Sequence, residues 1–209
     1  MEKKGNEFKG LAGGRSYQNL ARLFGFNERF YQKGAGDIRL ADGMKALDLG
    51  CGPGALSFAL AEKASSQAEI IGIDISDDQL DYARSQCARY DCNIRFEKCS
   101  MDELPYPDGY FDLVVTSMAL HETPPEVRRA AIVQTARTLK KGGRFILVDW
   151  GKPKFGWQGI FWFPMICWGK QNRDNRRNVY PELCRQNGLQ PKEDCYINSI
   201  ARRQVFVKE

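Results

Sequence analysis

Histidine is nearly absent from this chain, which has only one, and its seven cysteines form no C-x-x-C pair. Structural zinc sites need several cysteine or histidine ligands at short, regular spacing. We therefore predict no bound metal. Because the cysteines are odd in number and scattered, we expect reduced thiols in a cytoplasmic protein and not a disulfide framework.

Long apolar runs are missing as well. No stretch approaches the roughly 20 residues that a membrane-spanning helix needs, and no signal-peptide pattern is seen, so a cytoplasmic protein is expected. The net charge of +5 is a mild basic bias that does not by itself indicate a nucleic-acid partner, and none is expected. What remains is 209 residues with 43% hydrophobic and 27% charged side chains, the composition of one globular domain.

The most informative stretch is residues 47–54, which read LDLGCGPG and place three glycines at every second position. Such a turn lets a ligand lie against bare backbone between a strand and a helix. An acid, Asp48, stands two residues before the first glycine. A second acid, Asp74, ends the next apolar run, where a carboxylate can accept hydrogen bonds from both hydroxyls of a ribose. The first half of the chain therefore predicts a nucleoside-binding βαβ unit.

The charge of the ligand separates two kinds of site. Residues 50–55 fit the looser G-x-G-x-x-A pattern of dinucleotide-binding proteins, which hold an anionic pyrophosphate on free backbone N–H groups. Pro53 removes one such N–H group, and the Asp48 carboxylate would repel a phosphate. A cationic ligand meets neither difficulty. An NAD(P)-dependent oxidoreductase stays open as an alternative, disfavoured by these two residues.

Residues 48–54 resemble the first motif of the class I S-adenosylmethionine-dependent methyltransferases, whose cofactor carries a sulfonium and an ammonium but no phosphate. Residues 100–112, 116–121 and 139–143 resemble later segments of that family, with Ser100 where an acid is usual. The resemblance implies that S-adenosylmethionine is the cofactor. The cofactor-binding residues that it implies are Asp48, Gly50, Cys51, Gly52, Gly54, Asp74, Ile75, Ser100, Met101, Thr116 and Ser117.

The resemblance also implies roles for these residues. Asp74 would hold the ribose, Ile75 and Met101 would enclose the adenine, and Thr116 or Ser117 would offer backbone contacts to the methionine end.

Short apolar runs alternate with helical patterns, as expected when helices cover both faces of a sheet. The runs are 44–49, 69–73, 94–96, 111–116 and 144–148. This alternation predicts an α/β fold with a doubly wound, seven-stranded, mostly parallel sheet, in which residues 193–199 and 204–207 form an antiparallel C-terminal hairpin. The glycines at 142–143 are expected to cap the preceding helix. Residues 44–209 would form a single Rossmann-like methyltransferase domain, after an N-terminal helical lid over residues 1–43.

His121 is the only histidine, and its ordinary pKa near neutrality suits a general base that takes a proton from the methyl acceptor. The alternative is a loop residue that packs over the cofactor, because transfer from a sulfonium to a good nucleophile needs little acid–base help. His121 is therefore the candidate catalytic residue, with both roles open.

All four tryptophans lie between Trp150 and Trp168, among phenylalanines and with lysine and arginine on either side. Glycines and Pro164 interrupt this segment, so a long regular helix is not expected. We expect residues from about 150 to about 178 to form a wall of the acceptor site, the alternative being a flap over the core. The residues proposed to contact the acceptor are Tyr17, Tyr31, Trp150, Trp157 and Trp162.

Tryptophan beside lysine and arginine also suits a membrane surface, so peripheral membrane contact is a further expectation. Residues 149–153 resemble the segment after the fifth strand in quinone-ring C-methyltransferases. The sequence thus predicts methyl transfer to a small, apolar or lipid-like acceptor, and leaves the acceptor atom and the oligomeric state undetermined. A protein that binds S-adenosylmethionine without catalysis is the alternative, because the motif requires no catalytic residue.

Overall fold

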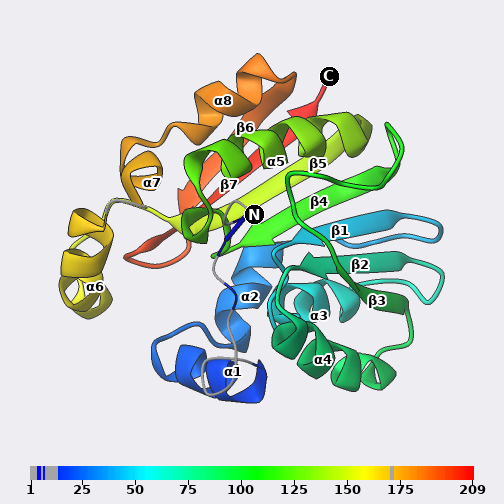
Figure 1. Cartoon of the computed structure of the whole chain (residues 1–209), viewed down its shortest axis with the longest axis horizontal. Helices are drawn as coiled ribbons and strands as arrows, with labels where there is room; N and C mark the ends of the chain where they lie inside the picture. Colours follow the sequence, from blue (N-terminus) through cyan, green and yellow to red (C-terminus); the bar gives the residue numbers. More distant parts are fainter. Residues whose placement is uncertain (1–3, 6, 8–13, 170–171) are drawn as a thin grey trace.

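The computed structural model describes residues 4–5, 7, 14–169 and 172–209. Its centre is a seven-stranded sheet in the order β3-β2-β1-β4-β5-β7-β6 (Figure 1). The strands are β1 (Lys45–Leu49), β2 (Glu69–Asp74), β3 (Asn93–Lys98), β4 (Phe111–Ser117), β5 (Leu139–Trp150), β6 (Leu189–Tyr196) and β7 (Ala201–Lys208). The first five pair in parallel, and β7 pairs antiparallel with β5 and β6. The predicted α/β fold and its C-terminal hairpin are confirmed.

Helices cover both faces of the sheet because its strands are apolar on both sides. One hydrophobic core lies under α2 (Glu28–Ala35), α3 (Ala55–Ala61) and α4 (Asp77–Gln86). The other lies under α5 (Pro125–Thr138) and α8 (Tyr180–Gln186). Figure 1 shows the two groups on opposite sides of the strands. With both faces covered, the ends of the strands are the places left for a ligand.

The strand order reverses between β1 and β4, which lie side by side at the centre of the sheet. Chain connections leave these two strands toward opposite sides, and such a switch point opens a crevice at the carboxyl ends of the strands. The residues that follow β1 and β4 therefore face one another across the position where a nucleoside is expected.

The predicted glycine cap of α5 is wrong. The helix ends at Thr138 and β5 begins at the next residue, with Leu139 opposite Phe111. Pairing resumes at Arg144, and Gly142 turns the chain between the two paired positions with a φ of +75°. Pairing of the chain with β4, and not a local capping motif, therefore ends α5. Gly142 instead adopts the positive φ that the irregular part of β5 requires.

The tryptophan-rich segment forms a helix that was not expected. α6 (Trp157–Trp168) continues through Pro164, although a proline removes one intrahelical hydrogen bond. Gly156 and Gly169 stand at its two caps. Its inner side chains pack on the body of the protein through the buried Ile166 and the partly buried Trp162, so tertiary contacts outweigh the low helix propensity of the segment.

Two further helices, α1 and α7, complete the helices of the fold in the described residues. α1 (Gly14–Leu23) precedes α2 at the start of the chain, and α7 (Arg173–Arg177) links α6 to α8. Short 3-10 turns occur at Cys87–Arg89 and at η3 (Leu120–Glu122). The N-terminal part is helical from Gly14 onward, and its action as a lid remains a proposal.

Candidate active site

A cleft opens where β1, β2, β3 and β4 end, and the loop after each strand contributes to its wall. The space between its walls is about 830 Å³, part of it open to solvent. The predicted residues that line it are Tyr31, Asp48, Gly50, Cys51, Gly52, Asp74, Ile75, Ser100, Met101 and Ser117. The fold therefore brings most of the predicted cofactor site into one place.

Each glycine of the loop after β1 meets a different requirement. Gly50 has a φ of +66°, and a Cβ on it would lie 2.6 Å from the Cβ of Ala119, so the loop passes β4 only with glycine there. Gly54 starts α3, where a Cβ would lie 2.8 Å from the Phe58 ring; it does not line the cleft. A Cβ on Gly52 would meet no atom within 4 Å. Gly52 thus leaves bare backbone facing the cleft, as a closely approaching ligand needs.

Asp48 is a buried carboxylate with one oxygen unused. The Ser57 hydroxyl donates to its Oδ2 at 2.6 Å, whereas Oδ1 has no partner among the described residues. Burial raises the pKa of Asp48, the hydrogen bonds from Ser57 lower it and the charge of Asp74 raises it, which leaves it at about 7. A buried, unpartnered carboxylate oxygen fits a cationic ligand and disfavours a pyrophosphate.

Asp74 ends β2 and holds the glycine loop in position. Its Oδ2 accepts a hydrogen bond from the backbone N–H of Gly52 at 2.8 Å, and its Oδ1 accepts one from Ser76 at 2.9 Å. Burial raises the pKa of Asp74, although these backbone hydrogen bonds act to lower it. Each oxygen keeps further acceptor capacity for ribose hydroxyls. The carboxylate of Asp74 therefore holds the backbone of the glycine loop, in addition to its predicted role in binding the ribose.

The N-terminal segment covers the end of the cleft that follows β3. Gly5 is buried, and a Cβ on it would lie 3.3 Å from Ile75. Lys4 forms an ion pair with Asp102 at 2.9 Å, and the hydroxyl of Ser100 donates to the same carboxylate. Asp102 thus anchors the terminal segment and orients Ser100, and it does not itself line the cleft.

At the end of β4 only one of the two predicted residues faces the cleft. The hydroxyl of Thr116 donates to the carbonyl of Leu49 at 2.8 Å and lies behind β1, so Thr116 does not line the cleft. Ser117 does, and its hydroxyl is buried without a partner among the described residues. Met118 follows with a φ of +54°, an uncommon backbone conformation for a side chain of this size. Such strain is concentrated at ligand sites, and no sequence pattern indicated it here.

His121 is buried beside the cleft and is held by two acids. Its Nδ1 lies 2.7 Å from Asp149, at the end of β5, and its Nε2 lies 3.0 Å from Glu122. Burial lowers the pKa of His121, but the charge and hydrogen bond of Asp149, with Glu122, raise it to about 9. Both ring nitrogens are engaged and the ring is protonated at neutral pH, so this geometry favours a structural role. Its action as a general base stays a prediction.

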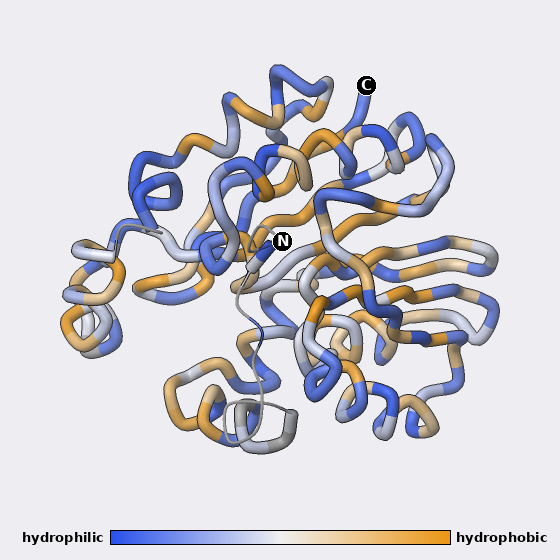
Figure 2. Tube along the Cα trace, viewed as in Figure 1, coloured by the Kyte–Doolittle hydropathy of each residue, from blue (hydrophilic) through white to orange (hydrophobic). Residues whose placement is uncertain are grey.

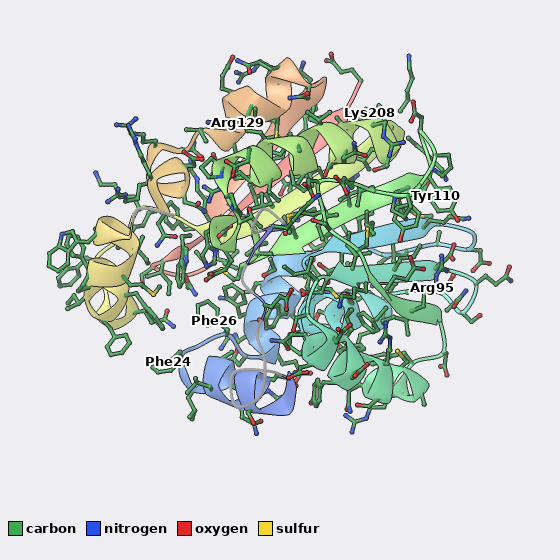
Figure 3. The ribbon with its side chains drawn as sticks, in the orientation of Figure 1. Phe24, Phe26, Arg95, Tyr110, Arg129 and Lys208 are labelled. Carbon is green, nitrogen blue, oxygen red and sulfur yellow. The ribbon has the colours of Figure 1, made fainter. Side chains whose placement is uncertain are left out.

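The two tryptophans proposed to contact the acceptor and described here lie behind the cleft. Trp150 and Trp162 have ring centroids 5.7 Å apart. They form an aromatic cluster with Phe24 and Phe26, the two members that Figure 3 labels. Their indole N–H groups are buried without a partner among the described residues. Met118 packs against this cluster and also lines the cleft. It is therefore the link between the cluster and the cofactor region.

The side chains of Tyr17 and Trp157 lie outside the described part of the structure, so their predicted contacts with the acceptor stay predictions. Tyr31 lines the cleft from α2. No three His, Cys, Asp or Glu side chains within the described ranges gather as metal ligands would.

Several cleft residues gave no signal in the sequence. Gln79 of α4 is buried, and its side-chain oxygen accepts a hydrogen bond from the backbone of Gly14 at 3.2 Å. Glu122 and Thr123, after β4, also line the cleft. Gln79 reaches the site only because α4 is folded against the start of α1. Glu122 and Thr123 line the cleft because they directly follow residues 116–121 beyond the carboxyl end of β4.

Comparison with known proteins extends the similarity beyond the motifs. Residues 46–143 match a family described as a methyltransferase domain. An uncharacterized methyltransferase of Synechocystis sp. is 36% identical over 153 residues, which cover 71% of this chain and 68% of that protein. This chain belongs to the methyltransferase family. The predicted enzyme class is confirmed, and S-adenosylmethionine, the methyl donor of this class, is confirmed as the cofactor at the level of the family.

More distant relatives agree. The ubiquinone/menaquinone biosynthesis C-methyltransferase of Francisella philomiragia is 26% identical over 155 residues, which cover 73% of this chain and 61% of that enzyme. The crystal structure of an S-adenosylmethionine-dependent methyltransferase from Aquifex aeolicus superposes with a TM-score of 0.70 at 17% identity, covering 93% of this chain and 96% of that one. That likeness shows a shared Rossmann-like fold. The acceptor and the role of each site residue remain to be proposed.

Proposed function

We propose that this methyltransferase transfers a methyl group from S-adenosylmethionine to a small, apolar or lipid-like acceptor. The observation that carries the proposal is the pair of acids at the bare glycine loop. Asp48 offers a free carboxylate oxygen in a buried position, and Asp74 closes the adjoining strand. A ligand that combines a cationic end with a ribose complements both acids, and a dinucleotide complements only one.

The residues of this chain would hold the cofactor along the cleft. The ribose would hydrogen-bond to Asp74, and the adenine would lie near Ile75 and Met101, both of which line the wall. The cationic end would lie toward Asp48 and Ser117, whose free polar atoms need partners. The bound cofactor supplies an electrophilic methyl group on its sulfonium. The protein supplies alignment and exclusion of water, which can account for much of the acceleration.

Support for an apolar acceptor comes from the surroundings of the cleft. Met118 and Tyr31 line it, and the aromatic cluster of Trp150 and Trp162 lies behind Met118. The similarity to a quinone C-methyltransferase points in the same direction.

The environment of His121 bears on the choice of acceptor. A protonated imidazole cannot take a proton, and the two acids beside His121 keep it protonated at neutral pH. The acceptor is then expected to be nucleophilic by itself, because the protein offers no base at this position. This requirement leaves the acceptor atom open among carbon, nitrogen, oxygen and sulfur.

The test compares ligands and two glycine variants. S-adenosylmethionine and its demethylated product should raise the melting temperature by mass action, because binding adds about 2.7 kcal/mol to the free energy of unfolding at a hundredfold excess over Kd. NAD should not. Gly52→Ala should lose most of this shift because its Cβ would enter the cleft. Gly188→Ala is the matched control, since Gly188 also has a positive φ and open space around it but lies away from the cleft.

A labelled methyl group should then pass from S-adenosylmethionine to a quinone or lipid fraction of a cell extract. A larger thermal shift with NAD, or equal loss of cofactor binding in the two glycine variants, would contradict the proposed site. Normal cofactor binding without transfer to any fraction would instead favour a binding protein.

A further inference from the structure

A large apolar surface lies on α6 and beside it. Six exposed apolar side chains come from this segment: Phe155, Ile160, Phe161, Phe163, Met165 and Trp168. The exposed fractions reach 99% at Phe155 and 76% at Trp168. Leu20 and Leu23 of α1 are also exposed, and the end of α1 contacts α6 through Phe24, 5.9 Å from Phe161 between ring centroids. We call these eight exposed residues the α6 patch.

The α6 patch is separate from the side of the helix that anchors it. Ile166 is fully buried, and Trp162 packs against Trp150. In Figure 1, α6 stands out from the body of the protein, and Figure 2 shows apolar residues along the projecting helix. Monomeric proteins rarely expose a contiguous apolar patch of this kind without a partner. A helix that is apolar on both its outer and its inner side is normally buried, either within a protein or in a membrane.

Positive charge surrounds the α6 patch. Lys152 and Lys154 precede the helix and are exposed. After it, a second cleft is lined by Trp168 together with five arginines, Arg128, Arg129, Arg173, Arg176 and Arg177.

The acids in the lining of that cleft are Glu122 and Asp174, and Asp174 is paired with Arg128 at 3.0 Å. The cleft therefore carries a net positive charge. It also shares Gly5, Glu122 and Thr123 with the cofactor cleft. The cationic surface thus extends from the α6 patch to the entrance of the active site.

We propose that α6 docks this protein on an anionic membrane surface. The apolar side chains of the patch enter the boundary between headgroups and acyl chains, while the flanking lysines and arginines contact lipid phosphates. Trp168 lies where both kinds of contact meet, as tryptophan does at membrane interfaces. No helix in the described ranges is both long enough and apolar enough to cross a membrane, so the helix lies in the interface.

Charge complementarity decides between a membrane and a second copy of the chain. A copy carries the same cations around the same patch, and a symmetric contact would bring them together. An anionic bilayer neutralises them. The docking is independent of the proposed methyl transfer, and it would place the shared rim of the two clefts beside the bilayer.

Binding to vesicles tests the docking directly. The full chain should sediment with vesicles of phosphatidylglycerol and phosphatidylcholine, bind vesicles of phosphatidylcholine alone much more weakly, and be released by high salt. The double variant Ile160→Ser with Phe163→Ser should bind at least about tenfold more weakly, because two apolar side chains leave the interface. Val133→Ser, at an exposed apolar residue of α5, is the matched control and should bind normally.

A charge variant completes the design. Arg177→Glu should weaken binding to the anionic vesicles, whereas Lys141→Glu, at an exposed lysine in the turn between α5 and the paired part of β5, should change it less. Circular dichroism and melting temperature establish that each variant is folded. Phe155→Ser serves if the double variant does not fold, since its side chain is almost wholly exposed.

Three results would overturn the docking. The first is equal binding to neutral and anionic vesicles, and the second is equal loss of binding in the α6 and Val133 variants. The third is a dimer in light scattering that the α6 variants convert to a monomer without any change in vesicle binding, which would assign the patch to a second copy of the chain.

Discussion

At the scale of single residues, the site depends on carboxylates that are buried away from solvent. Asp48 is 1% exposed and has one hydrogen-bond donor, Ser57. Its raised pKa means that the folded protein without ligand favours the protonated acid. This acid contributes stability below pH 3.8, and that contribution is lost as the pH rises toward about 7. A cationic ligand would favour the ionised form.

Asp48→Asn should therefore separate stability from binding. At pH 8 the variant should unfold at a higher temperature than the native protein, because an amide avoids the burial of a charge, with a gain of at least about 1 kcal/mol. Its affinity for S-adenosylmethionine should fall about tenfold or more, since an ionic hydrogen bond is lost. Chemical denaturation and calorimetry measure the two effects. Ser57→Ala, which removes only the donor, is the control; lower stability of Asp48→Asn at pH 8 would contradict this account.

At the scale of elements, the segment before α1 acts on the cofactor cleft from far away in the sequence. Gly5 lies against Ile75, and Lys4 pairs with Asp102 and Glu103 after β3. These contacts cover the wall where the adenine is proposed to lie. The described residues of this segment belong to none of the hydrophobic cores, so we expect the segment to act on retention of the ligand more than on stability.

Deleting residues 1–7 should therefore speed the release of S-adenosylmethionine several-fold while the melting temperature of the free protein changes little. Stopped-flow displacement measures the release. Lys4→Ala is the control, and it should have a small effect because exposed ion pairs contribute little to stability. An unchanged rate of release in the shortened chain would mean that the terminal segment does not cover the bound cofactor.

At the scale of the whole molecule, His121 ties the loop after β4 to the end of β5. Its ring lies between Asp149 and Glu122 and packs 5.5 Å from Trp150. Because its pKa is raised from 6.5 to about 9 on folding, its contribution to stability is full below pH 6.5 and is lost as the pH rises to about 9. This window overlaps that of Asp48 near pH 7 and extends above it, so the effect of His121 is measured apart from that of Asp48 at the upper end of the range.

The free energy of unfolding should accordingly fall between pH 6.5 and pH 9, by roughly 2–3 kcal/mol. His121→Gln should lose most of this slope and should be less stable than the native protein mainly at the lower pH. Denaturant titrations across the range measure it. If His121→Gln kept both the slope and the stability but abolished methyl transfer, the general-base role would be favoured instead.

Much of this protein was determined by short stretches of its sequence. Strands and most helices follow from apolar periodicity, and the cofactor loop follows from glycines flanked by two acids. These features are local: a turn that needs positive φ needs glycine wherever the chain goes, and a strand end after an apolar run carries its acid to the edge of a parallel sheet. The acids Asp48 and Asp74 could therefore be predicted before their contacts were known.

Features that depend on contacts between distant parts of the chain could be seen only in the tertiary structure. Pairing with β4 ended α5 without its expected glycine cap, and packing of Trp162 on Trp150 kept α6 helical through Pro164. Asp149 and Glu122, brought together by the fold, raise the pKa of the only histidine to about 9. Propensities and motifs act over a few neighbouring residues and contribute a fraction of a kilocalorie to a few kilocalories each. Burial and charge pairing between residues far apart in the chain contribute as much or more, and no local pattern contains them.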